Sequence, residues 1–295
     1  MLIASFPSPG TNVIEIGPLT IHFYGILIGL GVVVAAIVTT RRYARFGGDA
    51  SILDSVIMWT VIIGFAGART GYLITHFSRY SDRWYGVFFI WEGGLALYGG
   101  LTAGAITAIY MLRKHGGDFV MFTDAVAVGL PLAQAIGRFG NYFNQELFGT
   151  PSTLPWAVEI DRAYRPPQYV DYSTFHPTFL YEALWNFLIT VPVILFLERR
   201  NKLARGARFP VYMIVYGLIR LLTELLRTDT TFRLLGVSRN GWISVAAIIA
   251  GVVLFVIAQK RGVTYDQDDP DDADEFGDAD EFGDQADDSE IVDAQ

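Results

Sequence analysis

Long apolar stretches, separated by short polar segments, follow one another along most of the chain. Seven of them are candidates for membrane-spanning helices, at residues 19–40, 52–77, 95–112, 119–136, 177–197, 209–226 and 242–259. Most reach the roughly 17–25 residues that the hydrocarbon core of a bilayer requires. The third and fourth stretches are weaker, because they are rich in glycine and end in polar motifs. The pattern predicts an all-α, polytopic integral membrane protein with about seven transmembrane helices.

Composition agrees with a membrane protein and separates the chain into two parts. Hydrophobic residues make up 52% of the sequence, with 30 Gly and 21 Phe, which is not the composition of a soluble domain. The net charge is -8, but residues 264–295 hold 15 of the 30 acidic residues and no basic one. We therefore expect a basic transmembrane catalytic domain over 1–263 and an acidic, disordered cytoplasmic tail over 264–295.

The distribution of basic residues between the loops predicts the orientation. One set of loops holds twelve Lys and Arg residues, whereas the alternate, longer set holds seven. The richer set is expected on the cytoplasmic side, with the N-terminus outside and the C-terminus inside. The longest outside loop, at about 142–176, is then expected to form a small extracytoplasmic head.

The most informative motif begins where the fourth apolar stretch ends. Within residues 137–149 it places Arg138, Asn141, Asn144 and Glu146 among glycines. A charged residue at the edge of a membrane segment is costly and normally marks a site. An arginine beside amides and close to lipid indicates a headgroup phosphate as the ligand.

Other polar side chains lie at membrane depth, and each has a second interpretation that stays open. Tyr216, Arg220 and Glu224 share one helical stripe, which is either a wall of a lipid-headgroup site or an ion pair that lowers the cost of insertion. Arg69 lies in a glycine-rich stretch that is also typical of helix packing. Tyr24 and Tyr98 are either site residues or interfacial anchors.

Several kinds of chemistry are absent from the sequence. The chain has no cysteine, which excludes disulfides, thiolate metal sites and a cysteine nucleophile of its own. No histidine pair has the spacing of metal ligands, and no phosphate-binding loop or nucleophile-elbow motif occurs. We expect neither a metal nor a cofactor, and no nucleic-acid partner.

Taken together, these motifs resemble the prolipoprotein diacylglyceryl transferase family over about residues 10–260. The run from Gly137 to Gly149 is similar to the signature of that family. Supporting motifs follow in the expected order, at residues 22–25, 67–72, 91–94, 176–182 and 216–227. One position departs, because better-studied members carry a histidine where this chain has Tyr98.

The resemblance implies a reaction in the bacterial plasma (inner) membrane. The diacylglyceryl group of phosphatidylglycerol passes to the lipobox cysteine of a prolipoprotein, which gives a thioether and releases glycerol 1-phosphate. Arg138 and Arg220 are expected to hold the phosphate, with Glu224 orienting Arg220. Asn141, Asn144 and Glu146 would hold glycerol hydroxyls or orient Arg138.

The remaining residues implied by the resemblance are aromatic or lie near the outer interface. Tyr98 or Tyr24 would contact the thiol or the phosphate, and Tyr216 and Arg69 would help to bind phosphatidylglycerol. Membrane lipids are expected partners, since both substrates are embedded in the bilayer. The identity of the general base is not predicted.

Two other classes of protein stay possible at this stage. A small-solute membrane transporter also uses inward charges and helices broken by glycine, but it predicts an internal repeat, and no matching halves are found. A non-catalytic membrane scaffold would explain the packing glycines but not three inward arginines.

Overall fold

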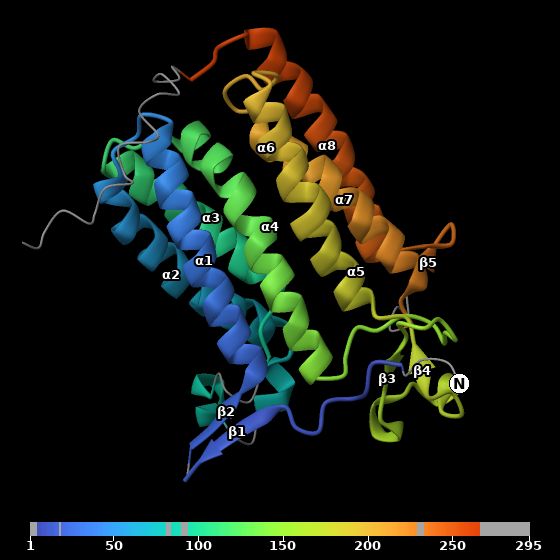
Figure 1. The fold of residues 1–295 in the computed structure, drawn as a ribbon. Helices are drawn as coiled ribbons and strands as arrows, with labels where there is room; N and C mark the ends of the chain where they lie inside the picture. The colour runs from blue at the N-terminus through green and yellow to red at the C-terminus, as the bar shows by residue number, and fades with distance from the viewer. Residues whose placement is uncertain (1–4, 18, 81–83, 90–93, 229–232, 266–295) are drawn as a thin grey trace, which may run out of the picture. The chain divides into compact units, whose positions relative to one another are not determined.

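Helices make up most of the structure, as the apolar pattern predicts. The computed structural model describes residues 5–17, 19–80, 84–89, 94–228 and 233–265 (Figure 1). The tail that we predict to be disordered lies outside these residues, apart from its first two. A compact unit extends from Met1 to Tyr265.

The long helices follow the predicted stretches closely. They are α1 (Phe23–Arg45), α2 (Leu53–Thr75), α3 (Leu97–Lys114), α4 (Phe119–Phe143), α5 (Thr178–Trp185), α6 (Val191–Arg199), α7 (Arg208–Leu226) and α8 (Arg239–Arg261). A π-helical turn, η7 (Asn186–Thr190), joins α5 to α6 without a break, so the two helices form one span.

Six helical spans of the described residues are long and apolar enough to cross a membrane. The helix α3 is not among them. It has only 18 residues, and two of those in its last turn are basic. The chain is thus a multi-pass membrane protein, and the seventh span stays a prediction.

The largest difference from the predicted spans is at α4, which continues to Phe143 rather than ending at 136. The sequence pattern ends there because Arg138 and Asn141 interrupt the apolar run. Both side chains have partners inside the protein, so the helix continues through them. The first half of the signature motif is therefore helical and does not belong to the head loop.

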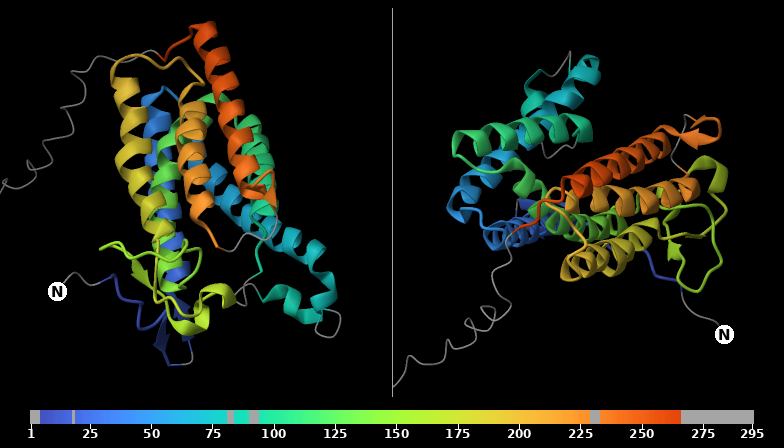
Figure 2. Two further views of the ribbon diagram at one scale, coloured as in Figure 1. Left: turned by 90° about the vertical axis from the view of Figure 1, so that its right-hand side faces the viewer. Right: turned by 90° about the horizontal axis from the view of Figure 1, so that it is seen from above.

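Glycines allow the helices to pack in close pairs. The main pairs are α1 with α4, α2 with α3, and α7 with α8. A Cβ atom on Gly67 of α2 would lie 2.8 Å from the carbonyl oxygen of Gly99 on α3. A Cβ on Gly31 of α1 would lie 2.9 Å from the carbonyl oxygen of Ala133 on α4. Such small-residue contacts favour helix association in lipid. The helix α4 contacts α1, α5 and α7 and therefore lies inside the bundle (Figure 2).

The segment between α4 and α5 forms the predicted head. Two short strands pair antiparallel in it, β3 (Val158–Glu159) with β4 (Thr174–Phe175), near the N-terminal end of α5 (Figure 1). The 3₁₀ turns η5 (Arg162–Tyr164) and η6 (Pro167–Tyr169) lie between them. Phe148, Val158 and Phe175 are buried in its small core. Phe6 forms a β-bridge with Val158, so the segment around Phe6 also belongs to the head.

The remaining short elements lie at helix ends. A hairpin of β1 (Val13–Ile16) and β2 (Leu19–His22) leads into α1. Another, of β5 (Arg233–Leu234) and β6 (Val237–Ser238), leads into α8. The 3₁₀ turn η1 (Ala50–Ile52) precedes α2, and η2 (Phe77–Tyr80) and η3 (Trp84–Phe88) follow it.

A buried ionic cluster joins the helix ends that lie opposite the head. Glu198 at the end of α6 pairs with Arg42 at 2.7 Å and with Arg208 at 3.5 Å. Asp124 is fully buried and accepts hydrogen bonds from the backbone N–H of Gly206 (2.6 Å) and from the Tyr265 hydroxyl (2.9 Å). Burial, and then the neighbouring carboxylate, raise the pKa of Tyr265, which keeps the phenol protonated as a donor.

We therefore predict that the stable C-terminal boundary of the membrane domain lies after Tyr265 and not at Gly262. Truncation after Gly262 removes one donor of the Asp124 carboxylate, which keeps the backbone N–H groups of Gly206 and Arg208, and it removes the ring that stacks on Phe46. A hydrogen bond to a charged group contributes about 1.5–3 kcal/mol. Thermal unfolding in detergent should give a lower melting temperature for this truncation than for one after Tyr265. Equal melting temperatures would show that the Tyr265 contacts add no stability.

Candidate active site

Arg138, Glu182 and Arg220 meet between three helices, α4, α5 and α7. Arg138 Nη2 lies 2.5 Å from Glu182 Oε2, and Arg220 Nη1 lies 3.2 Å from Glu182 Oε1. The Thr223 hydroxyl donates to the same Oε1 over 3.0 Å. Glu182 therefore bridges two arginines that come from different helices.

Glu224 forms a second junction, one helical turn after Arg220. Its Oε2 lies 3.0 Å from Arg220 Nη2 and 3.8 Å from Arg227 Nη1. Its Oε1 accepts hydrogen bonds from the Ser238 hydroxyl at 2.7 Å and from Asn240 Nδ2 at 3.4 Å. Residues from the β6 strand and the start of α8 thus complete the site.

The cations and the anions of this cluster differ in exposure. Its arginines are Arg138, Arg220 and Arg227, and its carboxylates are Glu182 and Glu224. The two carboxylate side chains are only 2% exposed, whereas the Arg138 and Arg220 side chains are each 17% exposed. The carboxylates are therefore the buried part of the cluster, and the guanidinium groups are the part that a ligand can reach. Such a site favours an anion.

A chain of polar contacts connects Arg138 to the rest of the signature motif. Arg138 Nη1 donates to Asn141 Oδ1 over 3.4 Å, and Asn141 Nδ2 donates to Glu146 Oε1 over 2.9 Å. Asn144 Nδ2 donates to the same Glu146 oxygen over 3.2 Å. Glu146 is exposed, and it lines a cavity of about 600 Å³ together with Asn12, Asn144 and Tyr164. The predicted signature residues therefore extend from the buried cluster to an open cavity.

Two tyrosines border Arg138. The Tyr216 side chain lies near Arg138, and its ring stacks on Tyr212 with the ring centres 5.5 Å apart. Tyr24 lies against Gly140, where a Cβ atom would be 2.5 Å from the tyrosine ring. A glycine is needed at this position because any side chain would push Tyr24 away from α4.

Two of the predicted site residues lie apart from this cluster. Arg69 is buried and donates to the carbonyl oxygens of Gly86 (2.7 Å) and Val87 (2.8 Å), so it holds the segment that follows α2. Tyr98 is 51% exposed on the first turn of α3. Within the described residues, no contact of either side chain with Arg138 or Arg220 is recorded. Their predicted contacts with substrate stay predictions.

Glu182 is the main site residue that was not predicted from the sequence. It could have been found from its position directly after Tyr181 inside an apolar span, because a carboxylate there needs a partner. The sequence could not identify that partner, since Arg138 and Arg220 come from helices that meet α5 only in the folded structure. Thr223, Ser238 and Asn240 gave no signal at all.

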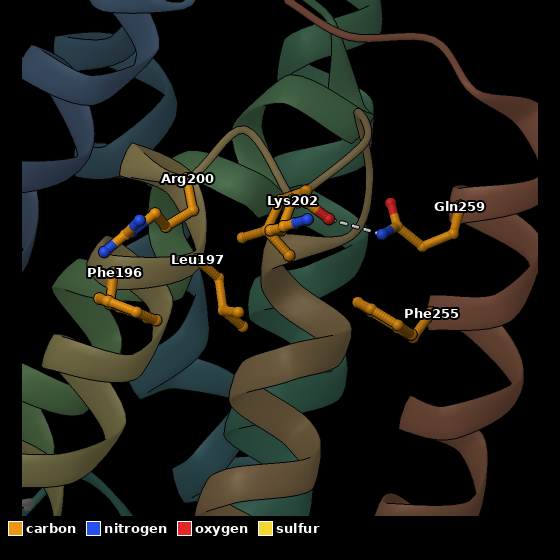
Figure 3. Close-up of a pocket in the computed structure, with 7 residues that line it drawn as sticks. Phe196, Leu197, Arg200, Lys202, Phe255 and Gln259 are labelled. Carbon is orange, nitrogen blue, oxygen red and sulfur yellow. Dashed lines mark hydrogen bonds between the residues drawn. The ribbon is translucent and has the colours of Figure 1, made fainter.

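A second cavity, of about 500 Å³, lies between the C-terminal ends of α6 and α8, on the side of the protein away from the head (Figure 3). Its lining is mostly apolar and includes Phe196, Leu197 and Phe255. Gln259 closes one side through a hydrogen bond from its Nε2 to the carbonyl oxygen of Lys202. None of the predicted site residues lines this cavity, so we place the candidate site at the other cluster. Within the described residues, no group of three or more His, Asp or Glu side chains could hold a metal ion.

Comparison with known proteins gives one consistent result. The family model described as prolipoprotein diacylglyceryl transferase matches residues 11–257. A phosphatidylglycerol–prolipoprotein diacylglyceryl transferase of Frankia alni is 41% identical over 273 residues, which is 90% of this chain and 70% of the relative.

Relatives from other bacteria are similar to the same extent. One from Streptomyces coelicolor, named phosphatidylglycerol–prolipoprotein diacylglyceryl transferase 2, is 41% identical over 88% of this chain and 83% of its own length. One from Cutibacterium acnes is 39% identical, over 87% of this chain and 88% of its own length.

Proposed function

The chain belongs to the prolipoprotein diacylglyceryl transferase family, and we propose that its arginine–carboxylate cluster is the place where the diacylglyceryl group leaves phosphatidylglycerol. It is a multi-pass membrane transferase that uses phosphatidylglycerol and a prolipoprotein as substrates. The observation that carries the proposal is that the Arg138 and Arg220 guanidinium groups are partly exposed, whereas the carboxylates that hold them are buried. The relatives give no support to a small-solute transporter.

The chemistry requires a group that stabilises charge on phosphate. The cysteine thiolate attacks the glyceryl carbon, and a carbon–sulfur bond forms while the carbon–oxygen bond to phosphate breaks. The departing oxygen keeps the electron pair, so a phosphodiester with one negative charge becomes glycerol 1-phosphate with two. Arg138 and Arg220 are donors held in place before the reaction by Glu182, and preorganised donors of this kind stabilise developing charge most strongly.

The signature residues near the open cavity can form hydrogen bonds with the glycerol hydroxyls, which are the uncharged part of the headgroup. Glu146 accepts from two amides and is exposed, so its second oxygen can accept from a glycerol hydroxyl. Asn144 lines the same cavity, and the buried Asn141 holds Glu146 in place through its Nδ2. We assign these three residues to glycerol recognition, and Tyr216 and Tyr24 to the wall beside the phosphate.

The thiol-activating group is a separate question. An electropositive site by itself favours the thiolate of the substrate. Tyr98 and Arg69 remain candidates for contact with the thiol or the lipid on the strength of the sequence alone.

We further propose that the head faces the outside of the cell. The basic residues of the richer loop set include Arg42, Arg113, Arg199 and Lys260, which lie near the helix ends opposite the head. By the positive-inside rule these ends are cytoplasmic. The N-terminus is then outside and the C-terminus, with its acidic tail, inside. The catalytic domain, predicted over 1–263 from the sequence, would extend to Tyr265, and the extracytoplasmic head, predicted over 142–176, would begin after Phe143.

A lipid-transfer assay tests the proposed function. Purified chain in phosphatidylglycerol vesicles is mixed with a lipobox peptide, and a matched peptide with serine in place of cysteine is the control. We expect diacylglyceryl peptide by mass spectrometry and an equal amount of glycerol 1-phosphate, with neither product from the serine peptide. Folded, inserted protein that forms no product would contradict the proposal.

We predict that Arg220 and Glu224 act as a unit. They are ion-paired at 3.0 Å, and removal of either leaves the other buried charge without this partner. Each single alanine variant should lower kcat about 100-fold or more. The double variant should be little worse than the worse single one, as measured by initial rates. Additive losses would mean that the two residues have separate roles.

A further inference from the structure

The chain leaves α4 through a turn in which one position is normally occupied by glycine. Gln145 has φ of 49°, in the left-handed region. Its N–H bonds to the carbonyl of Tyr142, and the N–H of Glu146 bonds to the carbonyl of Asn141. These are the two hydrogen bonds of a Schellman motif, in which the residue at the position of Gln145 is usually glycine. A glutamine there is strained, so its side chain needs a reason to be present.

The Gln145 side chain is buried and joined to the head at both ends of its amide. Its Nε2 donates to Asp161 Oδ2 over 2.7 Å, and its Oε1 accepts from the backbone N–H of Asp161, also over 2.7 Å. Hydrogen bonds from Gln145 and then from Ser8 hold the pKa of Asp161 below its ordinary value, so the carboxylate is charged at neutral pH. We call this pair, Gln145 and Asp161, the amide clamp.

The amide clamp lies directly beside a proposed substrate residue. Glu146 follows Gln145, and Leu147 after it also has a positive φ, of 56°. The Thr178 hydroxyl donates to the Leu147 carbonyl, which fixes the other side of the turn. Glu146 is therefore held between two strained residues, each tied to a different part of the protein. Strain of this kind persists only where the surroundings impose it, and it is concentrated at functional sites.

We propose that Gln145 is a positioning residue for diacylglyceryl transfer, which places Glu146 through its amide clamp to Asp161. Gln145 makes no recorded contact with Arg138 in the described structure; it acts through Glu146, Asn141 and then Arg138. The inference rests on the proposed function, because it assigns a role in the same reaction.

Four variants test the inference. Gln145→Gly keeps the turn and relieves its strain but deletes the clamp, so folding is preserved. Asp161→Ala removes the carboxylate that accepts from Gln145 Nε2 but keeps the backbone N–H that donates to Gln145 Oε1. Asp161→Asn retains an oxygen that accepts from Gln145. Ser8→Ala removes the other hydrogen bond of Asp161, at 2.8 Å, and is the matched control.

We expect Gln145→Gly to have a melting temperature equal to or above that of the unmodified protein. Its kcat/KM should fall about tenfold to 100-fold, the effect of a small misplacement of a site group. Asp161→Ala should give a smaller loss in the same direction, because it removes one of the two hydrogen bonds, and the Gln145→Gly/Asp161→Ala double variant should be no worse than Gln145→Gly. Asp161→Asn and Ser8→Ala should remain close to the unmodified protein.

Separate values of kcat and KM distinguish a positioning role from a role in stability alone. If the loss in Glu146→Gln comes mainly from kcat, the loss in Gln145→Gly should also come mainly from kcat, and likewise for KM, because both changes act on the Glu146 carboxylate. A Gln145→Gly variant with unmodified kcat and KM, or with a loss divided between kcat and KM in the opposite way to that of Glu146→Gln, would overturn the inference. If the unmodified protein itself forms no product, the proposed function fails instead.

Discussion

Replacement of Arg138 by alanine is expected to abolish diacylglyceryl transfer while the protein still inserts and folds. Arg138 contacts both the Glu182 junction and Asn141 of the signature chain, so the change separates the two halves of the site. Loss of one preorganised donor to a developing oxyanion costs about 2.7–4 kcal/mol, or about 100-fold to 1,000-fold in kcat. The Glu182 carboxylate keeps Arg220 and Thr223, which limits the damage to folding.

The measurement is the initial rate of thioether formation at saturating phosphatidylglycerol. Arg162→Ala is a suitable control, because Arg162 is an exposed arginine of the head. Arg138→Lys retains the charge but cannot contact Glu182 and Asn141 together, since lysine lacks the planar fork. It should also be strongly impaired. A well-expressed Arg138→Ala protein with near-normal product formation would show that Arg138 does not serve the transferred phosphate.

Glu182→Gln is expected to be almost as harmful to catalysis, although Glu182 touches no substrate in this proposal. Glutamine retains the size of the side chain but removes the charge that holds Arg138 and Arg220 together. Removal of one partner from a buried ion pair costs about 3–5 kcal/mol. We therefore expect a lower melting temperature and, in the protein that remains folded, a loss in kcat of about 100-fold.

The structure offers a matched control for this change. Glu198 lies in the same span, is 4% exposed, and also bridges two arginines, Arg42 and Arg208. Glu198→Gln should lower the melting temperature in the same way but leave kcat of the folded protein unchanged. Equal kcat losses in both variants would mean that Glu182 acts only through stability. Thermal unfolding and initial rates on the same preparations distinguish these results.

The sequence predicted the helices well because lipid-facing segments must be apolar over a fixed length. It was least accurate where polar residues have partners that lie far away in the sequence. The sequence pattern predicts that the span before Arg138 ends at 136, because a charged residue with no nearby partner in the sequence indicates the edge of the membrane. In the structure, Glu182 supplies that partner, and the helix continues to Phe143.

The site could be predicted only in part, for the same reason. Arg220 and Glu224 lie one turn apart on a single helix, so their pairing follows from helical geometry. The bridge through Glu182 depends on how α4, α5 and α7 pack, which no local pattern contains. Arg69 could not be placed from the sequence either. Its guanidinium group donates to backbone carbonyls of the segment after α2, and its predicted contact with phosphatidylglycerol stays a prediction.

The π-helical turn in the fifth span determines which face of the helix carries the carboxylates of Glu182 and Glu198. Glu182 and Glu198 are sixteen positions apart in the sequence. At about 100° per residue, an unbroken α-helix would place them about 160° apart, on opposite faces. A π-helical turn accommodates one extra residue, which reduces the angle to about 60°. One added residue thus allows a single helix to present both carboxylates to the two arginines of α7, Arg220 and Arg208. Deleting one residue from 186–190 would leave fifteen positions between them, which an unbroken α-helix also places about 60° apart, so both carboxylates should still face α7. Adding a second residue there, without a second π-helical turn, would instead swing one of them toward lipid.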